Sequence, residues 1–492
     1  MIQLASKARS AVLWNAGFKI FRDGLQFASM LVLTRLLPTD YYGQFSFICS
    51  VVGFISIFSL NSFIAYLVQV KDDEHAHFQD HFTAGGVLNL GMLVITNLFA
   101  LGLLWHPKFA VVSPFLHVMS LSFLFEWPCN LRVKMIERDL DWQKLRSLHA
   151  IGLIASSAVG IFMAWANMKT YALIVPQFLI NIPFIYDLFI RQRWRPTWEF
   201  NWVTYRQSFN FGINRIGSGL ISKGRELLEA GVFASMLTWD SLGVFSRATG
   251  LAALLCLNIA SQFTYAIYPV LTRLSNEDGK AARAGSLVMQ VVAWITIPLA
   301  TSFVMLSGSL VPFIYGERWV DVTSLIPYTM VLGVILAHFH AAYTLLLARP
   351  GQVRLCLWAD FLILVGTSAS LLWALPHGVP SYLTGLVLSH IFVLFVLGYL
   401  LKCEGSIMLR RVATSITSAA VAAGVSGLVL HYAGGDFAIS AGRRFWVVAA
   451  WGLAYAGIYT IVLRVVFKNQ LESLLPYLPF PNLLHSIFVI QR

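Results

Sequence analysis

Fourteen long apolar runs follow one another along this chain, and they constrain its fold more than any other feature. A helix that crosses a bilayer needs about 20 consecutive apolar residues, and most of the runs reach this length. The runs are continuously apolar instead of alternating, which predicts helices and excludes the strands of a membrane barrel. The predicted spans lie near residues 12–37, 43–70, 83–105, 111–135, 147–167, 171–190, 209–237, 243–270, 284–314, 322–348, 355–375, 380–401, 413–432 and 445–467.

The composition agrees with this interpretation. Charged residues make up 12% of the 492 residues, whereas soluble domains contain about a quarter, and the mean hydropathy is +0.70. These values exclude a soluble globular protein, a disordered chain and a collagen-like fibre. The predicted fold class is an all-α polytopic membrane protein with about 14 transmembrane helices. The first residues lead directly into a long span, so we expect no cleavable signal peptide.

Motifs of nucleotide-binding and hydrolytic enzymes are missing from the sequence, among them the P-loop, GxGxxG, HExxH and GxSxG. The five cysteines are odd in number and include no CxxC pair, which argues against a disulfide framework or a zinc ribbon. We therefore expect no metal, no cofactor and no enzymatic activity. Any energy that the protein uses would then come from a gradient of H⁺ or Na⁺, or from the gradient of its own substrate.

The basic residues predict the orientation of the spans. With the amino terminus in the cytoplasm, 23 of the 35 Lys and Arg residues fall in inner segments and six in outer ones. This asymmetry is what the positive-inside rule requires. An even number of spans places the carboxyl terminus in the cytoplasm as well. The cytoplasmic linker 191–206 is basic and aromatic, and we expect it to form a short helix lying in the membrane interface.

An internal repeat divides the chain. When the sequence is shifted by 200 residues, LPTDYYGQFSF at 37–47 falls on LTWDSLGVFSR at 237–247, with identical residues that include Asp40/Asp240 and Gly43/Gly243. Six spans in each half predict a parallel repeat about an axis along the membrane normal. The predicted lobes are 1–200 and 201–402, which would face each other across a central cleft. Residues 403–492 would add two helices and a cytoplasmic tail.

Charged side chains lie within two spans that the repeat relates, those near 12–37 and 209–237. Transfer of a charge into the bilayer is unfavourable. A charge at the bilayer centre costs about 2.5–3.5 kcal/mol on insertion scales, so it faces protein or water. In each of the two spans the charges fall largely on one helical face. We expect both faces to line a hydrated cavity whose six cations exceed its three carboxylates and therefore attract an anion. The candidate anion-binding residues are Lys19, Arg22, Arg215, Lys223, Arg225 and Arg247.

The same charges have a second interpretation, in which they neutralise each other. Lys19 and Asp23 are four residues apart, as are Arg225 and Glu229, and Lys223 and Glu226 are three apart, so each pair can meet on a helix. Such pairing leaves the surplus of three positive charges in place. The candidates for binding a coupling ion are the three carboxylates, Asp23, Glu226 and Glu229.

Three segments of the sequence resemble those of a known family. TRLLPTDYYGQFSF at 34–47, with LGVFSRATG at 242–250 and AIYPVLTRLS at 266–275, is similar to the polysaccharide transport family of the multidrug/oligosaccharidyl-lipid/polysaccharide exporter superfamily, the Wzx-type flippases. Family members usually carry a tyrosine where Phe245 stands. The resemblance covers roughly residues 10–400. It implies the MATE-like fold of the superfamily and a multi-pass protein of the bacterial inner membrane, and the internal repeat predicts a monomer.

The resemblance also implies a substrate and a role. The protein would translocate undecaprenyl-pyrophosphate-linked oligosaccharide repeat units by alternating access, for O-antigen, capsule or exopolysaccharide. Its expected partners are a polymerase and a chain-length regulator. The cationic cavity would hold the pyrophosphate, and no nucleic acid is expected to bind. The alternatives are a cation-coupled multidrug exporter of the same fold, a membrane glycan polymerase or glycosyltransferase, a lipid scramblase and a peptidoglycan-precursor flippase.

Overall fold

The protein is all-helical in the computed structural model, which describes residues 2–59, 61–64, 74–274, 280–348, 353–401, 406–440 and 445–468. No strand occurs in these ranges. Backbone contacts divide the chain into one unit that ends at Gly243 and a second that begins at Val244. Because a bilayer offers no hydrogen-bond partners, helices that satisfy their own backbone groups are the expected solution for so apolar a sequence.

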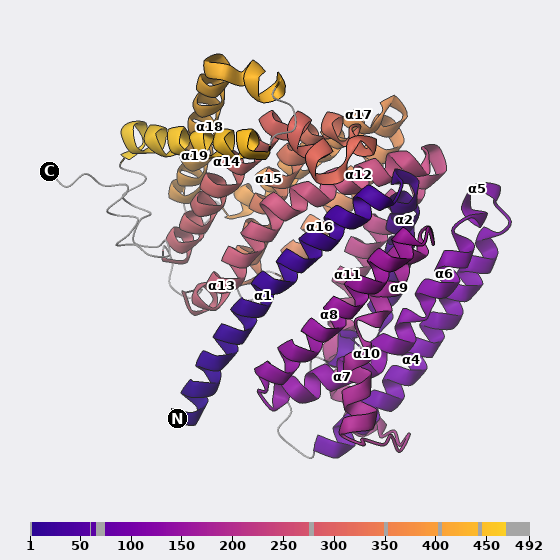
Figure 1. Ribbon diagram of the computed structural model, residues 1–492. Helices are drawn as coiled ribbons and strands as arrows, with labels where there is room; N and C mark the ends of the chain where they lie inside the picture. Colours follow the sequence, from indigo (N-terminus) through magenta and orange to yellow (C-terminus); the bar gives the residue numbers. More distant parts are fainter. Residues whose placement is uncertain are drawn as a thin grey trace. The chain divides into compact units, whose positions relative to one another are not determined.

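The first unit contains α1 and α11, the two helices that carry the charged stripes, and the helices packed beside them (Figure 1). Helix α1 packs along α8, α8 along α9, and α4 along α6 and α7. Helix α11 packs against α2 and α3. The helices of this unit are α1 (Ile2–Leu36), α2 (Thr39–Ile55), α3 (Asn61–Ile64), α4 (Glu74–Leu103), α5 (Pro107–Ala110), α6 (Ser113–Ser120), α7 (Ser122–Arg138), α8 (Trp142–Trp165), α9 (Tyr171–Leu179), α10 (Ile182–Tyr186) and α11 (Trp202–Met236), with a π-helical turn at Asp187–Arg191.

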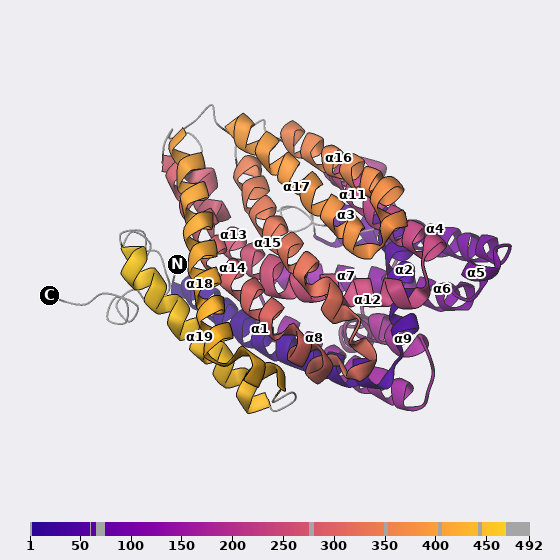
Figure 2. The ribbon, with the colours of Figure 1, turned by 90° about the horizontal axis from the view of Figure 1, so that it is seen from above.

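The second unit is built around α14, which packs against α15 and α18 (Figure 2). Helix α12 (Trp239–Ala252) leads into it. A buried cluster at the α14–α18–α19 contact includes Trp294, Ala419 and Tyr459, and the Tyr459 hydroxyl donates to the Trp294 carbonyl at 3.1 Å. The helices that follow α12 are α13 (Asn258–Leu274), α14 (Lys280–Tyr315), α15 (Val322–Leu347), α16 (Val353–Ala369), α17 (Val379–Leu401), α18 (Ser406–Ser440) and α19 (Phe445–Val466), with π-helical turns at Ala253–Leu257 and Ser370–Ala374.

Eleven helical segments in the described part of the chain are long and apolar enough to cross a membrane. They correspond to all the predicted spans except the first, fourth and seventh. Helices α1 and α11 are each 35 residues long, about 52 Å, but their charges lower the hydropathy. The fourth predicted span is interrupted between α6 and α7. The polytopic helical fold is therefore confirmed, and the total of 14 spans and the lobe boundaries at 200 and 402 stay predictions.

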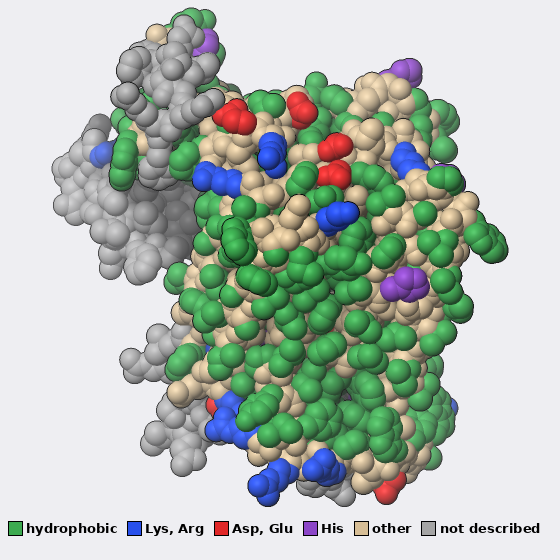
Figure 3. Space-filling view, turned by 45° about the vertical axis from the view of Figure 1, so that its right-hand side comes forward, with side chains coloured by type: hydrophobic (Ala, Val, Ile, Leu, Met, Phe, Trp, Pro, Cys, Tyr) green, Lys and Arg blue, Asp and Glu red, His purple; other side chains and the backbone are tan. Residues whose placement is uncertain are grey.

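The surface carries the apolar side chains that a membrane protein exposes to lipid. Hydrophobic side chains cover most of the face drawn in Figure 3, and charged ones gather towards its upper and lower ends. On α4 alone, Val87, Val94 and Leu98 are more than half exposed. In water such a helix would be unfavourable, whereas in a bilayer its apolar side chains meet lipid tails.

The linker between α10 and α11 differs from its prediction. Residues 193–201 form no helix and lie beside α4, with left-handed backbone at Arg193 and Trp198. Pro196 lacks an N–H and disfavours helix in the residue before it. The linker's backbone instead bonds to the carboxamide of Gln79, which accepts one hydrogen bond at 3.0 Å and donates another at 3.1 Å. The Trp198 ring meets Phe82 edge-on, so the linker packs on α4, and the prediction of a short helix is wrong for residues 193–201.

Candidate anion-binding site

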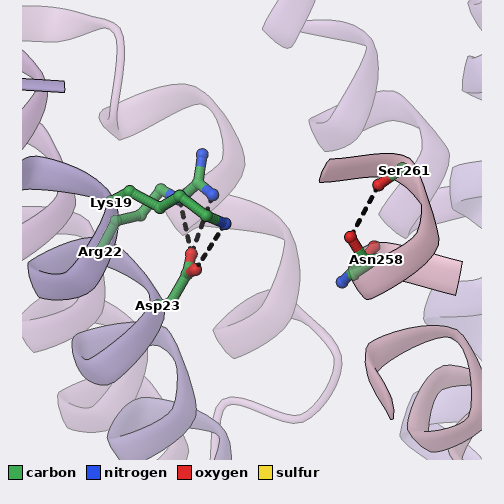
Figure 4. A network of polar contacts seen from close by, with 5 residues as sticks. All are labelled: Lys19, Arg22, Asp23, Asn258 and Ser261. Atoms are coloured by element: carbon green, nitrogen blue, oxygen red, sulfur yellow. Dashed lines mark hydrogen bonds and ion pairs between the residues drawn. The ribbon is translucent and has the colours of Figure 1, made fainter. Parts of the chain in front are cut away.

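The charged stripe of α1 forms a compact ion cluster. Lys19 Nζ lies 3.0 Å from one carboxylate oxygen of Asp23, and Arg22 donates to the other oxygen through Nε at 3.0 Å and Nη2 at 2.8 Å. Figure 4 shows both cations turned towards the single carboxylate. Two positive charges share one negative charge, so the cluster keeps a net positive charge.

This cluster is accessible. The side chains of Lys19, Arg22 and Asp23 are 43–46% exposed. Ion pairs this exposed contribute about 0.2–1 kcal/mol each, because water competes for both partners. An anionic group can therefore displace Asp23 from part of its contact with the cations at little cost. Fully desolvated pairs would resist such exchange.

Helix α11 carries a second pair. Lys223 Nζ lies 2.7 Å from Glu226 Oε2, and both side chains are 42% exposed. The Lys223 side chain passes beside Gly53 of α2, where an added Cβ would lie 3.9 Å from Lys223 Cδ, an ordinary van der Waals distance. The half-buried Arg225 makes no hydrogen bond or ion pair with any residue that the structure describes. Glu229 has an interaction partner of its own.

Two further candidates stand apart from these clusters. The side chain of Arg215, also on α11, lies outside the described residues. Arg247 belongs to the second unit, on α12, and interacts electrostatically with the buried hydroxyl of Tyr315 at the end of α14. The shared cavity between the halves stays a prediction. The structure confirms the predicted pairing at Lys19–Asp23 and Lys223–Glu226.

The first unit also contains a buried ion cluster that was not predicted from the sequence. Asp187 is only 1% exposed and accepts from Arg132 Nε at 2.6 Å, while Lys144 Nζ lies 2.9 Å away. The Arg191 guanidinium is 3.9 Å from its other oxygen. Because Arg132 and Asp187 are both buried, their pairing fastens α7 to the turn after α10 and offers no open anion site. In the sequence, the only local indication of this ion cluster is the i,i+4 spacing of Asp187 and Arg191.

A reciprocal contact supports the internal repeat. A Cβ atom built on Gly43 would lie 2.8 Å from the carbonyl carbon of Trp239, and one built on Gly243 would lie 2.9 Å from that of Thr39. A shift of 200 residues exchanges these two contacts, which is what a two-fold axis passing between the segments requires. Glycine is needed at both positions, since any side chain would meet backbone.

Comparison with known proteins places the chain in a family. Residues 32–324, more than half of the chain, match the family described as "Polysaccharide biosynthesis protein". The chain belongs to this family. Proteins similar to this chain include the lipopolysaccharide biosynthesis protein WzxC of Escherichia coli (strain K12), which is 20% identical over 71% of either chain.

Other relatives match over less of their length. The teichuronic acid biosynthesis protein TuaB of Bacillus subtilis (strain 168) is 21% identical over 50% of this chain and 51% of its own. The succinoglycan biosynthesis transport protein ExoT of Rhizobium meliloti (strain 1021) is 19% identical over 62% of each. The resemblance predicted from the motifs at 34–47 and 242–250 is thus confirmed at the level of the family.

Solved structures identify the fold. The lipid II flippase MurJ, in an inward closed conformation, superposes with a TM-score of 0.71, covering 93% of this chain and 99% of its own at 14% identity. An inward-facing multidrug-resistance MATE transporter of the MOP superfamily gives a TM-score of 0.51 over 80% of this chain and 95% of its own, at 12% identity. The predicted MATE-like fold is therefore correct, and the chain is a multi-pass membrane protein.

Proposed function

We propose that this protein is a flippase that moves undecaprenyl-pyrophosphate-linked oligosaccharide repeat units across the bacterial inner membrane for polysaccharide biosynthesis. The observation that carries the proposal is the accessible, net-positive cluster of α1, with the second set of cations on α11. Membership of the polysaccharide biosynthesis family and a fold shared with a lipid flippase support it.

The chemistry of the headgroup fits these side chains. A pyrophosphate has several oxygens that accept hydrogen bonds, and Arg and Lys are the residues that bind such oxygens best. Arg22 has guanidinium N–H groups beyond the two that bond to Asp23, and Lys19 has further ammonium protons. The polyprenyl tail would remain in lipid against apolar helix surfaces while the headgroup crosses.

The transport cycle is part of the proposal. Alternating access would expose the headgroup site first to the cytoplasm and then to the outer side, with both termini in the cytoplasm. Asp23, Glu226 and Glu229 are the candidates for coupling to H⁺ or Na⁺. The protein would act as a monomer and as a transporter without catalytic activity, beside a polymerase and a chain-length regulator of the same pathway.

A multidrug exporter is the second candidate, because a MATE transporter shares the fold. Exporters of cationic drugs need an acidic or aromatic site, whereas the α1 cluster holds two cations to one carboxylate. Transport of a cationic dye at the rate of the lipid substrate would favour this alternative.

Transport in proteoliposomes tests the proposal. The purified protein is reconstituted with a fluorescent undecaprenyl-pyrophosphate-linked oligosaccharide, and arrival of the glycan at the other leaflet is followed by its access to an added glycosidase. Arg22→Gln and Lys223→Gln should each slow translocation by about tenfold or more, because a charge-assisted hydrogen bond contributes about 1.5–3 kcal/mol. The matched control is Lys169→Gln, an exposed lysine remote in sequence from both stripes. Unchanged rates in both stripe variants would refute the cationic site.

A further inference from the structure

Lys108 joins α5 to the carboxyl-terminal end of α11. It lies on α5, the short helix between α4 and α6, and its ammonium donates to two backbone carbonyls at the end of α11. The acceptors are Ser235, at 2.9 Å, and Leu237, at 2.7 Å. The last carbonyls of a helix lack partners within the helix and carry partial negative charge, so a lysine placed there both caps and stabilises the end.

An aromatic cluster lies next to the contact between Lys108 and α11. Phe109, the neighbour of Lys108, packs against Phe47 of α2 and Trp239 of α12, with ring centroids 5.4 and 6.0 Å away. Phe47 and Trp239 are themselves 5.8 Å apart. The α5 segment therefore touches α2, α11 and the first turn of α12 at one place.

The glycine contact lies in the same place. Gly43 and Gly243 allow the first turns of α2 and α12 to approach backbone to backbone. The Thr39 hydroxyl donates to the Asp240 carboxylate across this contact. The two segments related by the sequence repeat are therefore in direct contact with each other. Helix α5 packs beside them through Phe109, while Lys108 binds the end of α11.

We propose that Lys108 is a positioning residue that latches the outer end of α11 in a closed arrangement. The inference rests on the proposed function for its orientation, in which α5 lies on the outer side. Arg225 lies on the same helix, about 18 Å from the latched end at 1.5 Å per residue. Release of the two hydrogen bonds frees the end of α11 to move away from α5, and this movement opens the path from the cationic stripe to the outer side.

A buried thiol measures the latch directly. Ala234 lies in the last turn of α11 and is fully buried, so Ala234→Cys, in a background without the native cysteines, reports opening of this end. Its reaction with a membrane-impermeant thiol reagent is followed in right-side-out vesicles. Lys108→Gln should raise the labelling rate by about tenfold, the factor expected for loss of a charge-assisted hydrogen bond. Lys108→Arg should restore slow labelling, and Lys169→Gln should not change it.

The labelling rates of the Lys108 variants support or overturn the proposed latch. Faster labelling with Lys108→Gln and rescue by Lys108→Arg would support it. Labelling unchanged by Lys108→Gln, or reaction only with a reagent on the cytoplasmic side, would overturn it. If Lys108→Gln does not fold, Phe109→Leu weakens the same closure through its aromatic contacts and should also accelerate labelling. Translocation by the unmodified protein is measured separately, so failure of the proposed function gives no transport while the labelling rates still report the latch.

Discussion

Replacement of Gly43 by alanine tests how closely the repeat-related turns must approach. The new methyl carbon would lie 2.8 Å from the carbonyl carbon of Trp239 and nearer still to its oxygen. Carbon atoms pack at about 3.5–4.0 Å, so α2 and α12 would have to separate here by about 1 Å. The obstacle is backbone on both sides, which cannot move aside as a flexible side chain can.

The expected cost follows from this geometry. Overpacking a close contact costs about 1–3 kcal/mol, and the better helix propensity of alanine returns up to about 1 kcal/mol. We therefore expect Gly43→Ala to lower the stability of the folded protein by about 1–2 kcal/mol. Gly243→Ala should cost about as much because its methyl carbon meets Thr39 in the same way. The double variant should cost less than the sum, since separation of the turns relieves both clashes.

Thermal unfolding in detergent is the assay, with helix content followed by circular dichroism. The matched controls are Gly17→Ala on α1 and Gly217→Ala on α11, where a Cβ meets nothing within 4 Å. The controls should melt at or above the temperature of the unchanged protein. If Gly43→Ala and Gly243→Ala melted as high as the controls, the backbone contact and the two-fold relation inferred from it would be wrong.

Three further outcomes follow from the ion clusters. Asp187→Asn should destabilise the protein by about 3–5 kcal/mol, because it leaves the buried charge of Arg132 without its carboxylate; a small fall in melting temperature would contradict this role. Asp23→Asn should change stability by less than about 1 kcal/mol and should tighten binding of inorganic pyrophosphate, measured by calorimetry; weaker binding would count against an anion site on α1. An increase in salt from 0.1 to 1 M shortens the screening length from about 10 to about 3 Å and should weaken pyrophosphate binding; affinity independent of salt would rule out a largely electrostatic site.

Much of the fold follows from periodicity and length in the sequence. The run 322–348 is predominantly apolar over more than 20 residues, as a membrane helix requires, and the structure has α15 at Val322–Leu347. The pairing of Lys19 with Asp23 was predictable for the same local reason, since residues four apart lie on one face of a helix.

Contacts between distant segments could not be predicted in this way. Lys108 bonds to backbone carbonyls 127 and 129 residues further on, and a backbone acceptor leaves no trace in the side-chain pattern. The linker 191–206 was predicted to form a short helix from its aromatic and basic residues, but residues 193–201 are not helical. Its conformation is instead determined by partners on α4, such as Gln79, that lie 116 and 118 residues away.

An affinity comparison shows whether the α1 and α11 cations bind an anionic lipid headgroup. The dissociation constants of the purified protein for undecaprenyl pyrophosphate and for undecaprenol are measured in the same detergent, with Arg22→Gln and Lys223→Gln beside the unchanged protein. We expect the pyrophosphate lipid to bind more tightly than the alcohol and each variant to reduce this preference by about tenfold. Equal affinity for the two lipids, or a preference that both variants retain, would contradict it.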